Sequence, residues 1–453
     1  MSEDTTLDEF GQENRSEVAS DVQDGWRRQQ LSEISHWTDA GGTPRTSNDE
    51  YWDGDIPWVQ TGELTKRHIR STEKQITELG LEESTAKRFP RGTLLIGMYG
   101  EPTVGESALL EIEATTNQAC CGIFPDPDTV NAEFLHQMMQ HEKPRLYSLR
   151  AGSGQQNIRQ GIIRKFEIDV PPLSEQRKIA TVLYTVDRAI EKTEEIIGQT
   201  RRVKQGVMDN VFEKGYHEHS GYDEVRIGPF DYEMPEGWDL CSIEESKGGE
   251  NGLRRGPFGG MLKKDIFVDE GYKVYQQQNV IYDDFEYGDY YITDEKFRDM
   301  ERFSVSAGDI LISCSGTLGK VAVVPENYEE GVINQALLKF TVDEDIFQTQ
   351  YIKYFLESKI GQRQLVLSSR GSAMKNMAPM EFVRSAQIFK PPIDEQSRIS
   401  DALLSLDKKV NIEKIKKRYL EELKQGLMQD LLSGTVRTTD TTIQVPEEIT
   451  KYG

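Results

Sequence analysis

A long internal repeat constrains the fold of this chain more than any other feature. Six short motifs of the first half return in the same order roughly 220 residues later, and so long a period excludes a solenoid. Chance can produce one such pair but not six in order. The sequence therefore predicts a tandem duplication. The pairs are Gly25-Trp26 and Gly237-Trp238, Gly92–Gly97 and Gly308–Ser313, Asn117–Ala119 and Asn334–Ala336, Gly152-Ser153 with Asn157 and Gly371-Ser372 with Asn376, Pro171–Gln176 and Pro391–Gln396, and Lys204–Met208 and Lys424–Met428.

Each copy has a strand-rich front domain followed by a long helix. Short apolar runs such as Thr93–Gly97, Val321–Val324 and Leu337–Thr341 stand between clusters of Gly, Pro, Asn and Asp, as strands do. Shorter helices are predicted around Ala132–Gln140 and Ile346–Gln364. The fold class is α+β. The predicted boundaries are an acidic tail (1–24), a front domain (25–172), a long helix (173–214), a linker (215–236), a second front domain (237–392), a second long helix (393–434) and a C-terminal tail (435–453).

The two long helices are predicted to pair with each other. A double proline ends each sheet, and Ser174 and Asp394 stand where an N-cap belongs. Apolar residues then recur at spacings of three and four, which makes one narrow stripe on a helix of about 60 Å. Such a helix needs a partner, so an antiparallel two-helix coil is favoured over two independent surface helices. The residues predicted to pair the helices are Ile179, Val186, Ile190, Leu406, Val410 and Leu423.

Composition excludes several classes of protein. No apolar run approaches the roughly 20 residues that span a bilayer, and the acidic N-terminus does not resemble a secretory signal, so a cytoplasmic protein is expected. The four cysteines form no CxxC pair and are expected to be small buried hydrophobes. The net charge of -23 argues against nucleic acid when taken alone, but much of the acidic excess lies in the tails, so local pattern decides.

No motif of a catalytic or metal site is present. Gly316-Thr-Leu-Gly319-Lys320 has the wrong spacing for a phosphate-binding loop and is expected to be a turn between strands. No Asn-Pro-Pro-Tyr-like motif of adenine methylation occurs. His217-Glu-His219 lies in the polar linker and is expected to be solvated. The sequence therefore predicts no catalytic residue, no metal site and no bound cofactor.

Polar and basic loops remain as candidates for binding DNA. Arg and Lys suit phosphates, whereas Gln, Asn and Arg read base edges. Any one such loop is more often an ordinary wet loop, although the Gly-Ser loop recurs in both halves. Trp52, Tyr99 and Phe258 could contact bases, but core packing is the stronger expectation. The candidate DNA-binding residues are Thr43, Arg45, Gln60, Lys66, Arg67, Arg70, Gln155, Gln156, Asn157, Arg254, Arg255, Lys263, Gln277, Gln278, Ser315, Thr317, Ser372, Lys375 and Asn376.

Several of these motifs resemble one known family. Pro-Pro-Leu-Ser-Glu-Gln-Arg-Lys-Ile (171–179), its repeat at 391–399, the two Lys-Gln-Gly-(Val/Leu)-Met helix ends and residues 308–321 resemble the specificity subunits of type I restriction-modification systems. The resemblance covers residues 25–434 and departs at 98–105, where an extra Glu-Pro stands in the loop.

The resemblance implies a division of labour. Each front domain would be a target recognition domain that reads one half of a split sequence in double-stranded DNA, and the helices would hold these domains apart. Two methyltransferase subunits would dock on the helices and bring S-adenosylmethionine. Restriction subunits would bring ATP and Mg. Because the loops of the two copies differ, such as 41–45 against 252–256, the target is expected to be asymmetric.

Two other classes of function compete with this interpretation. An enzyme with its own methyltransferase or endonuclease activity would need motifs that the chain lacks. A structural coiled-coil adaptor would explain the helices but not the duplicated front domains.

Overall fold

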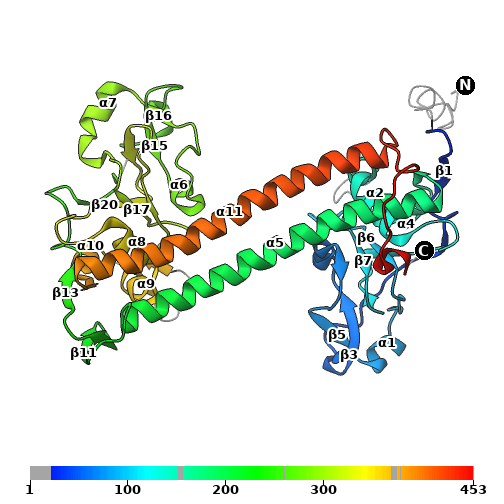
Figure 1. The fold of residues 1–453 in the computed structure, drawn as a ribbon, viewed down its shortest axis with the longest axis horizontal. Coiled ribbons are helices and arrows are strands. Elements are labelled where there is room, and N and C mark those ends of the chain that lie inside the picture. Colours follow the sequence, from blue (N-terminus) through cyan, green and yellow to red (C-terminus); the bar gives the residue numbers. More distant parts are fainter. Residues whose placement is uncertain are drawn as a thin grey trace, which may run out of the picture. The chain divides into compact units, whose positions relative to one another are not determined.

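A computed structural model describes residues 22–100, 102–150, 157–258, 261–368, 375–377 and 379–451. The chain divides into two compact units (Figure 1). Unit 1 comprises residues 1–193 and 416–453, and unit 2 comprises residues 194–415. Each unit therefore contains one front domain, the first half of the long helix that follows it, and the last half of the other long helix.

The front domain of unit 1 is built on a five-stranded sheet of order β2-β9-β6-β7-β4, in which only β4 and β7 are parallel. A three-stranded sheet, β5-β3-β8, and a ribbon, β1-β10, complete it. The strands are β1 (Arg27–Gln30), β2 (Ser35–Ala40), β3 (Trp52–Val59), β4 (His68–Ile69), β5 (Lys74–Ile76), β6 (Leu94–Gly97), β7 (Ser107–Leu110), β8 (Thr115–Thr116), β9 (Cys120–Pro125) and β10 (Glu167–Val170).

Short helices connect and cover these strands. Helix α2 carries eight buried residues, and its residue Gln137 contacts Asp187 of the long helix α5, beside which α2 lies in Figure 1. The helices are η1 (Asp49–Tyr51), η2 (Thr61–Lys66), α1 (Glu78–Glu82), α2 (Ala132–His141), α3 (Lys143–Ser148), α4 (Gln160–Arg164) and α12 (Glu447–Thr450).

Unit 2 repeats the plan with a four-stranded sheet, β14-β20-β17-β18, and a three-stranded sheet, β16-β15-β19. Three ribbons, β11-β12, β13-β23 and β21-β22, accompany them. The strands are β11 (Tyr222–Ile227), β12 (Phe230–Pro235), β13 (Asp239–Ser242), β14 (Leu253–Arg255), β15 (Tyr272–Tyr275), β16 (Tyr291–Ile292), β17 (Ile310–Ser313), β18 (Val321–Val323), β19 (Gly331–Ile333), β20 (Leu337–Phe340), β21 (Val366–Ser368), β22 (Lys375–Met377) and β23 (Gln387–Lys390).

The helices of unit 2 occupy matching places. The predicted helix over 346–364 is two helices, because the Ser358 hydroxyl accepts a hydrogen bond from the Gly361 N–H and starts a new helix. They are η3 (Lys264–Ile266), η4 (Glu301–Phe303), α6 (Gln277–Tyr282), α7 (Asp294–Asp299), α8 (Thr349–Glu357), α9 (Lys359–Leu365) and α10 (Met380–Ser385).

The two long helices are α5 (Leu173–Lys214) and α11 (Ile393–Leu432). The prediction that Ser174 and Asp394 are N-caps is wrong. Each helix begins one residue earlier, and the carbonyls of Pro172 and Pro392 accept the first backbone hydrogen bonds, at 2.8 and 2.9 Å from the N–H groups of Glu175 and Glu395. Proline suits this position because it supplies a carbonyl and has no N–H of its own to satisfy.

The ends of both long helices pack into the cores of the front domains. In unit 1 the core cluster contains Ile179 and Leu183 from the start of α5 and Leu431 from the end of α11. In unit 2 the core contains Leu403 from the start of α11 and Phe212 from the end of α5. The apolar stripe of each helix is therefore partly covered by a front domain rather than by the other helix.

Five of the six residues predicted to pair the helices are at least partly buried. Ile179 and Ile190 are fully buried, Val186 and Val410 nearly so, and Leu406 is half-buried. The prediction is wrong for Leu423, which is 51% exposed, while its neighbour Lys424 is buried. Ile412, Ile415 and Tyr419 are also exposed, so the middle of α11 presents a row of apolar side chains to solvent.

We expect Ile190→Asp and Val410→Asp each to lower the free energy of unfolding by about 3 kcal/mol or more, because each removes a buried apolar group and adds an unpaired charge. Val203→Asp is the matched control, since Val203 lies on α5 with 53% of its surface exposed. Chemical denaturation measures the change. A double variant of Ile190 and Val410 with unchanged unfolding would contradict the burial of these side chains.

Candidate nucleic-acid interface

In unit 2 several predicted DNA-binding residues lie on one hairpin and the segments beside it. Strands β17 and β18 form an antiparallel hairpin, with Gly316 and Gly319 at positive φ of 61° and 71°. The prediction of a turn rather than a phosphate loop is confirmed there. Ser315 and Thr317 are exposed at the tip of this hairpin. The glycines allow the tight reversal of the chain there, because glycine adopts positive φ without steric cost.

Four side chains near this hairpin carry buried polar atoms that have no hydrogen-bond partner among the described residues. They are the Nε atoms of Arg254 and Arg255 and the Oε1 atoms of Gln277 and Gln278. A Cβ on Gly316 would lie 3.4 Å from Oε1 of Gln277, so this side chain touches the hairpin tip. Leaving such a group unsatisfied costs about 1–3 kcal/mol, which a ligand with complementary groups would relieve.

One aromatic ring lies beside these polar groups. Phe258 is 67% exposed, and the Arg255 guanidinium lies 5.1 Å from the centre of its ring. The expectation that Phe258 and Tyr99 pack in a core is wrong, because Tyr99 is also 38% exposed. It holds for Trp52, whose ring meets Trp58 edge-on at 4.9 Å. An exposed ring beside an arginine suits contacts to bases and thymine methyl groups.

Most of the candidate residues of unit 1 have partners inside the chain. Gln60 forms a capping box with Glu63, and the Thr43 hydroxyl contacts Gln118. Lys66 pairs with Glu63 at 3.0 Å. Arg70 binds both oxygens of Glu111, at 2.9 and 3.0 Å. These contacts shape loops and satisfy charges, and the DNA contacts of these residues stay predictions.

The Arg67 side chain pairs with a residue of the long helix α5. Its Nη1 lies 2.6 Å from Oδ1 of Asp187, a fully buried carboxylate of α5. Lys424 of α11 approaches the other oxygen of Asp187 at 2.8 Å, and the Gln137 amide donates to it at 2.8 Å. Sequence reasoning missed this site, because its four residues are far apart along the chain.

A buried histidine, His68, is linked to this carboxylate through Glu133 and Gln137. His68 lies 2.9 Å from Glu133 and 3.8 Å from Glu191. Burial alone would lower the pKa of His68, but the two carboxylates outweigh it and raise the pKa to about 9. Burial instead lowers the pKa of His136 to about 3, so His136 is neutral near pH 7. The network between the first front domain and α5 thus contains a protonated His68.

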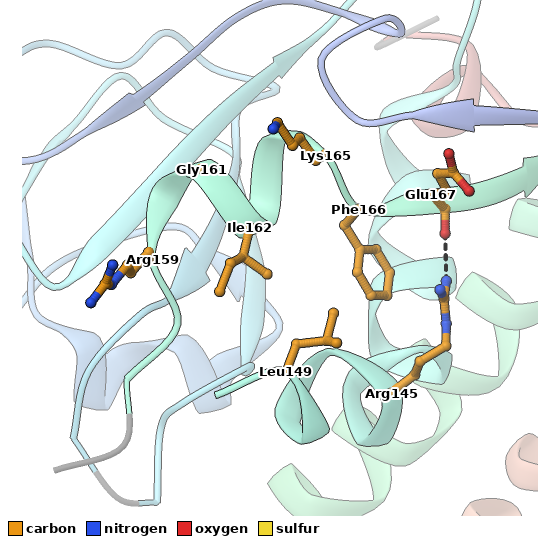
Figure 2. Close-up of a pocket in the computed structure, with 8 residues that line it drawn as sticks. All are labelled: Arg145, Leu149, Arg159, Gly161, Ile162, Lys165, Phe166 and Glu167. Carbon is orange, nitrogen blue, oxygen red and sulfur yellow. Dashed lines mark hydrogen bonds between the residues drawn. The ribbon is translucent and has the colours of Figure 1, made fainter. Parts of the chain in front are cut away.

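A shallow pocket of about 520 Å³ in unit 1 is lined by residues of helix α3 and of the segment 159–167 (Figure 2). Leu149, Ile162 and Phe166 supply its apolar surface, and the Arg145 guanidinium stacks on Phe166 at 4.0 Å while donating to the Glu167 carbonyl. Arg159 and Lys165 add two further cations to its lining.

The remaining candidates divide between described and undescribed residues. Arg45 and Lys263 are exposed and Asn157 is half-buried. The predictions for Gln155, Gln156 and Ser372 fall outside the described residues. Lys375 and Asn376 belong to strand β22, and their side chains are likewise outside the description.

Two smaller predictions are corrected. His219 is not solvated, because its ring lies 3.0 Å from the Glu395 carboxylate and meets Trp238 edge-on. The comparison of 41–45 with 252–256 has the wrong register. Gly41 matches Gly256, since a Cβ on either would meet the carbonyl oxygen of Asn117 or Asn334 at 2.4 or 1.8 Å.

The cysteines behave as predicted. Cys120, Cys121, Cys241 and Cys314 are free and buried, and burial raises the pKa of the first two to about 12. Over the described ranges no group of three or more potential metal ligands occurs. Nor does any helix among those residues have the length and apolarity to cross a membrane.

Comparison with known proteins identifies the family. The model of the type I restriction modification DNA specificity domain matches residues 23–199 and 258–423, more than half of the chain. The chain therefore belongs to this family. It is a DNA sequence-specificity subunit of a type I restriction-modification system, and such subunits are the non-catalytic components of their complexes.

Individual relatives agree with this assignment. The chain is 23% identical over 309 residues to the type I restriction enzyme MjaVIII specificity subunit of Methanocaldococcus jannaschii. The aligned residues make up 67% of this chain and 70% of that subunit. It is 28% identical over 161 residues to the EcoR124I/EcoR124II specificity subunit of Escherichia coli, 35% of this chain and 40% of that one. The fold matches the crystal structure of a type I S subunit from M. genitalium with a TM-score of 0.54 and 14% identity, over 91% of this chain and 97% of that one.

We expect His68 to make stability depend on pH. Because the pKa of His68 is raised in the folded protein, its contribution to the free energy of unfolding is complete below about pH 6.5. That contribution is lost as the pH rises through about 9. The free energy of unfolding should fall across this window by up to about 3 kcal/mol, at 1.4 kcal/mol per pKa unit.

Denaturation at a series of pH values tests this expectation. His68→Gln should lose this part of the pH dependence. The matched control is His36→Gln, whose ring is half exposed in the same unit, and it should keep that dependence. An unchanged pH profile in His68→Gln would show that the buried network does not hold a protonated histidine.

Proposed function

We propose that this subunit reads a split, asymmetric target in double-stranded DNA, with one front domain on each half-site. The duplication supports two readers on one chain, and membership of the specificity family supports DNA as the ligand. The observation that carries the proposal is the group of unpaired Arg and Gln atoms beside the β17–β18 hairpin. Such atoms are the donors and acceptors that read base edges.

The two domains present different groups at matching places, which supports an asymmetric target. Gly41 and Gly256 are equivalent, so Thr43 of the first domain stands where the exposed Phe258 stands in the second. The first offers a hydroxyl already bonded to Gln118, and the second offers an aromatic ring. Two unlike readers cannot both prefer the same half-site, so a palindrome is not the expected target.

We also propose that α5 and α11 run antiparallel as a coiled coil that sets the spacing of the half-sites. Contacts within each unit support this. In unit 1 the first half of α5 meets the last half of α11 through Asp187 and Lys424, at 2.8 Å. In unit 2 the last half of α5 meets the first half of α11 through Lys204 and Asp407, at 2.7 Å.

The partners are proposed from the family resemblance. Two methyltransferase subunits would dock on the long helices and bring S-adenosylmethionine, and restriction subunits would bring ATP and Mg, with no cofactor on this chain. The exposed row of apolar residues on α11 supplies a surface for one such partner. We also propose that the complex acts in the cytoplasm.

An exchange of domains tests the split target. Residues 25–172 are replaced by the matching domain of a relative, and methylated sites are mapped by sequencing DNA from cells that express the whole complex. One half-site should change while the other persists. A change in both halves, or a continuous palindromic target, would refute one domain per half-site.

A point variant gives the finer arm of this experiment. Arg255→Ala should weaken discrimination at one or two positions of the half-site that the exchange leaves unchanged, by about 1–3 kcal/mol per position. Arg226→Ala is the matched control, because this arginine is exposed on β11 of the same unit. Loss of discrimination in the other half-site would contradict the assignment.

We expect Leu423→Asp to weaken binding of the methyltransferase subunit without changing the melting of the isolated chain. Burying one leucine contributes about 1.5–3 kcal/mol, so affinity should fall roughly tenfold to a hundredfold. Gln425→Asp, exposed two residues further on and facing away from the row on a helix, is the control. Titration with the purified methyltransferase subunit measures both, and equal affinities would exclude this row from the interface.

A further inference from the structure

Each unit contains a carboxylate at the junction between its front domain and the long helices. In unit 1 this carboxylate is Asp187, which is fully buried. Arg67 reaches one of its oxygens at 2.6 Å, and Lys424 and Gln137 reach the other, each at 2.8 Å. The carboxylate therefore ties together the front domain and both long helices.

In unit 2 the matching carboxylate is Asp407 of α11. Lys204 of α5 lies 2.7 Å from one oxygen, and the Tyr354 hydroxyl of α8 donates to the other at 2.8 Å. A second cation, Lys353, lies 3.8 Å from Asp407 and 3.2 Å from Glu357, and the Asp407 side chain is 32% exposed. Asp283 of the front domain lies near Lys353 and Asp407. Burial raises the pKa of Asp283, and Lys353 opposes the rise.

The repeat makes the two junctions equivalent residue by residue. Asp187 matches Asp407, Lys424 matches Lys204, and Gln137 matches Tyr354. The register of α2 and α8 is fixed by their starts, where the side chains of Gln176 and Gln396 accept from the backbone N–H groups of Asn131 and Gln348. In that register His136 matches Lys353.

The loop residue at the junction also matches, but its charge is reversed. Arg67 and Asp283 each end a helical turn that begins with a glutamine capping box, at Gln60 and Gln276. Their φ angles are both positive, at 54° and 53°, which residues other than glycine rarely adopt, although their ψ angles differ, at -51° and 44°. The matching position in the loop thus carries a cation in one copy and an anion in the other.

We propose that Asp187 and Asp407 are positioning residues that fix each front domain on the helices by holding two cations, and that the two copies supply the domain's cation from different elements. In the first domain it is Arg67 on the loop, with His136 on the helix. In the second it is Lys353 on the helix, with Asp283 on the loop. The helix-borne cations, Lys424 and Lys204, are the same in both.

The consequence is that the charge on the loop and the charge on the helix must change together. A buried carboxylate that loses one of two cations is strongly destabilised, whereas moving the cation to a neighbouring element preserves the balance. Because the junction sets the angle at which a domain leaves the helices, a loosened junction changes which half-site spacings can be read. This readout rests on the proposed split target.

The test transplants the arrangement of unit 2 into unit 1. Arg67→Asp alone should reduce methylation of the wild-type target by roughly tenfold or more and admit targets whose spacer differs by one base pair. Adding His136→Lys should restore methylation to within roughly threefold of wild type and restore the single spacer length. Both half-site sequences should stay unchanged throughout.

Arg70→Asp is the matched control, because Arg70 pairs with Glu111 and Glu191 and not with Asp187. His136→Lys should not rescue it. Amide hydrogen exchange of residues 61–69 gives a readout that does not depend on DNA, and it should rise in Arg67→Asp and fall again in the double variant. Should Arg67→Asp fail to fold, Arg67→Ala with and without His136→Lys gives the same order.

The outcomes separate the two proposals. If the wild-type complex methylates a target that is not split, the proposed function fails. The amide hydrogen-exchange data alone then test the junction proposal. If the wild-type target is split but the double variant shows the same methylation and the same amide hydrogen exchange as Arg67→Asp, the junction proposal is overturned. Rescue of Arg70→Asp by His136→Lys would also overturn it, since the effect would then be general charge compensation.

Discussion

The fold depends on the burial of helix ends that carry charge. Each long helix begins in the core of one front domain, and the end of the other long helix completes that core. Apolar residues such as Leu183 and Leu403 supply most of the contact, but the same helices also bring Asp187 and Asp407 into the junction. The fully buried Asp187 is tolerated only with nearby cations and hydrogen-bond donors, so the junction of unit 1 is more specific in geometry than an apolar contact would be.

This constraint explains how a chain with a net charge of -23 can belong to a family that binds DNA. Several cations of the first front domain, Arg67 and Arg70 among them, are paired with acidic residues of the chain itself. In unit 2, four buried polar atoms without a partner among the described residues belong to arginine and glutamine side chains beside a glycine-rich hairpin. Local placement of donors and acceptors, rather than overall charge, therefore distinguishes the candidate reading surface.

The two copies also show which parts of a duplicated unit stay fixed. The glutamines at the starts of the long helices, Gln176 and Gln396, make the same contacts in both. Glu175 and Glu395 both bind the segment that follows the end of the other helix, through Arg437 in one copy and His219 in the other. Loop residues differ instead, as Thr43 and Phe258 do. Packing at the helix ends constrains the glutamines and glutamates, whereas the loop residues face solvent.

The sequence by itself determined the duplication, the α+β class, the bounds of α5 and the strands around Leu94, Val321 and Leu337, because these depend on local periodicity and on repeated motifs. It also predicted the turn at Gly316 and the buried cysteines. Only the tertiary structure decided that Leu423 is exposed while Lys424 is buried, and that Arg67 pairs with Asp187. The physical reason is that pairing of charges depends on distances between residues that are remote in sequence, and periodicity along one helix carries no information about what lies opposite it.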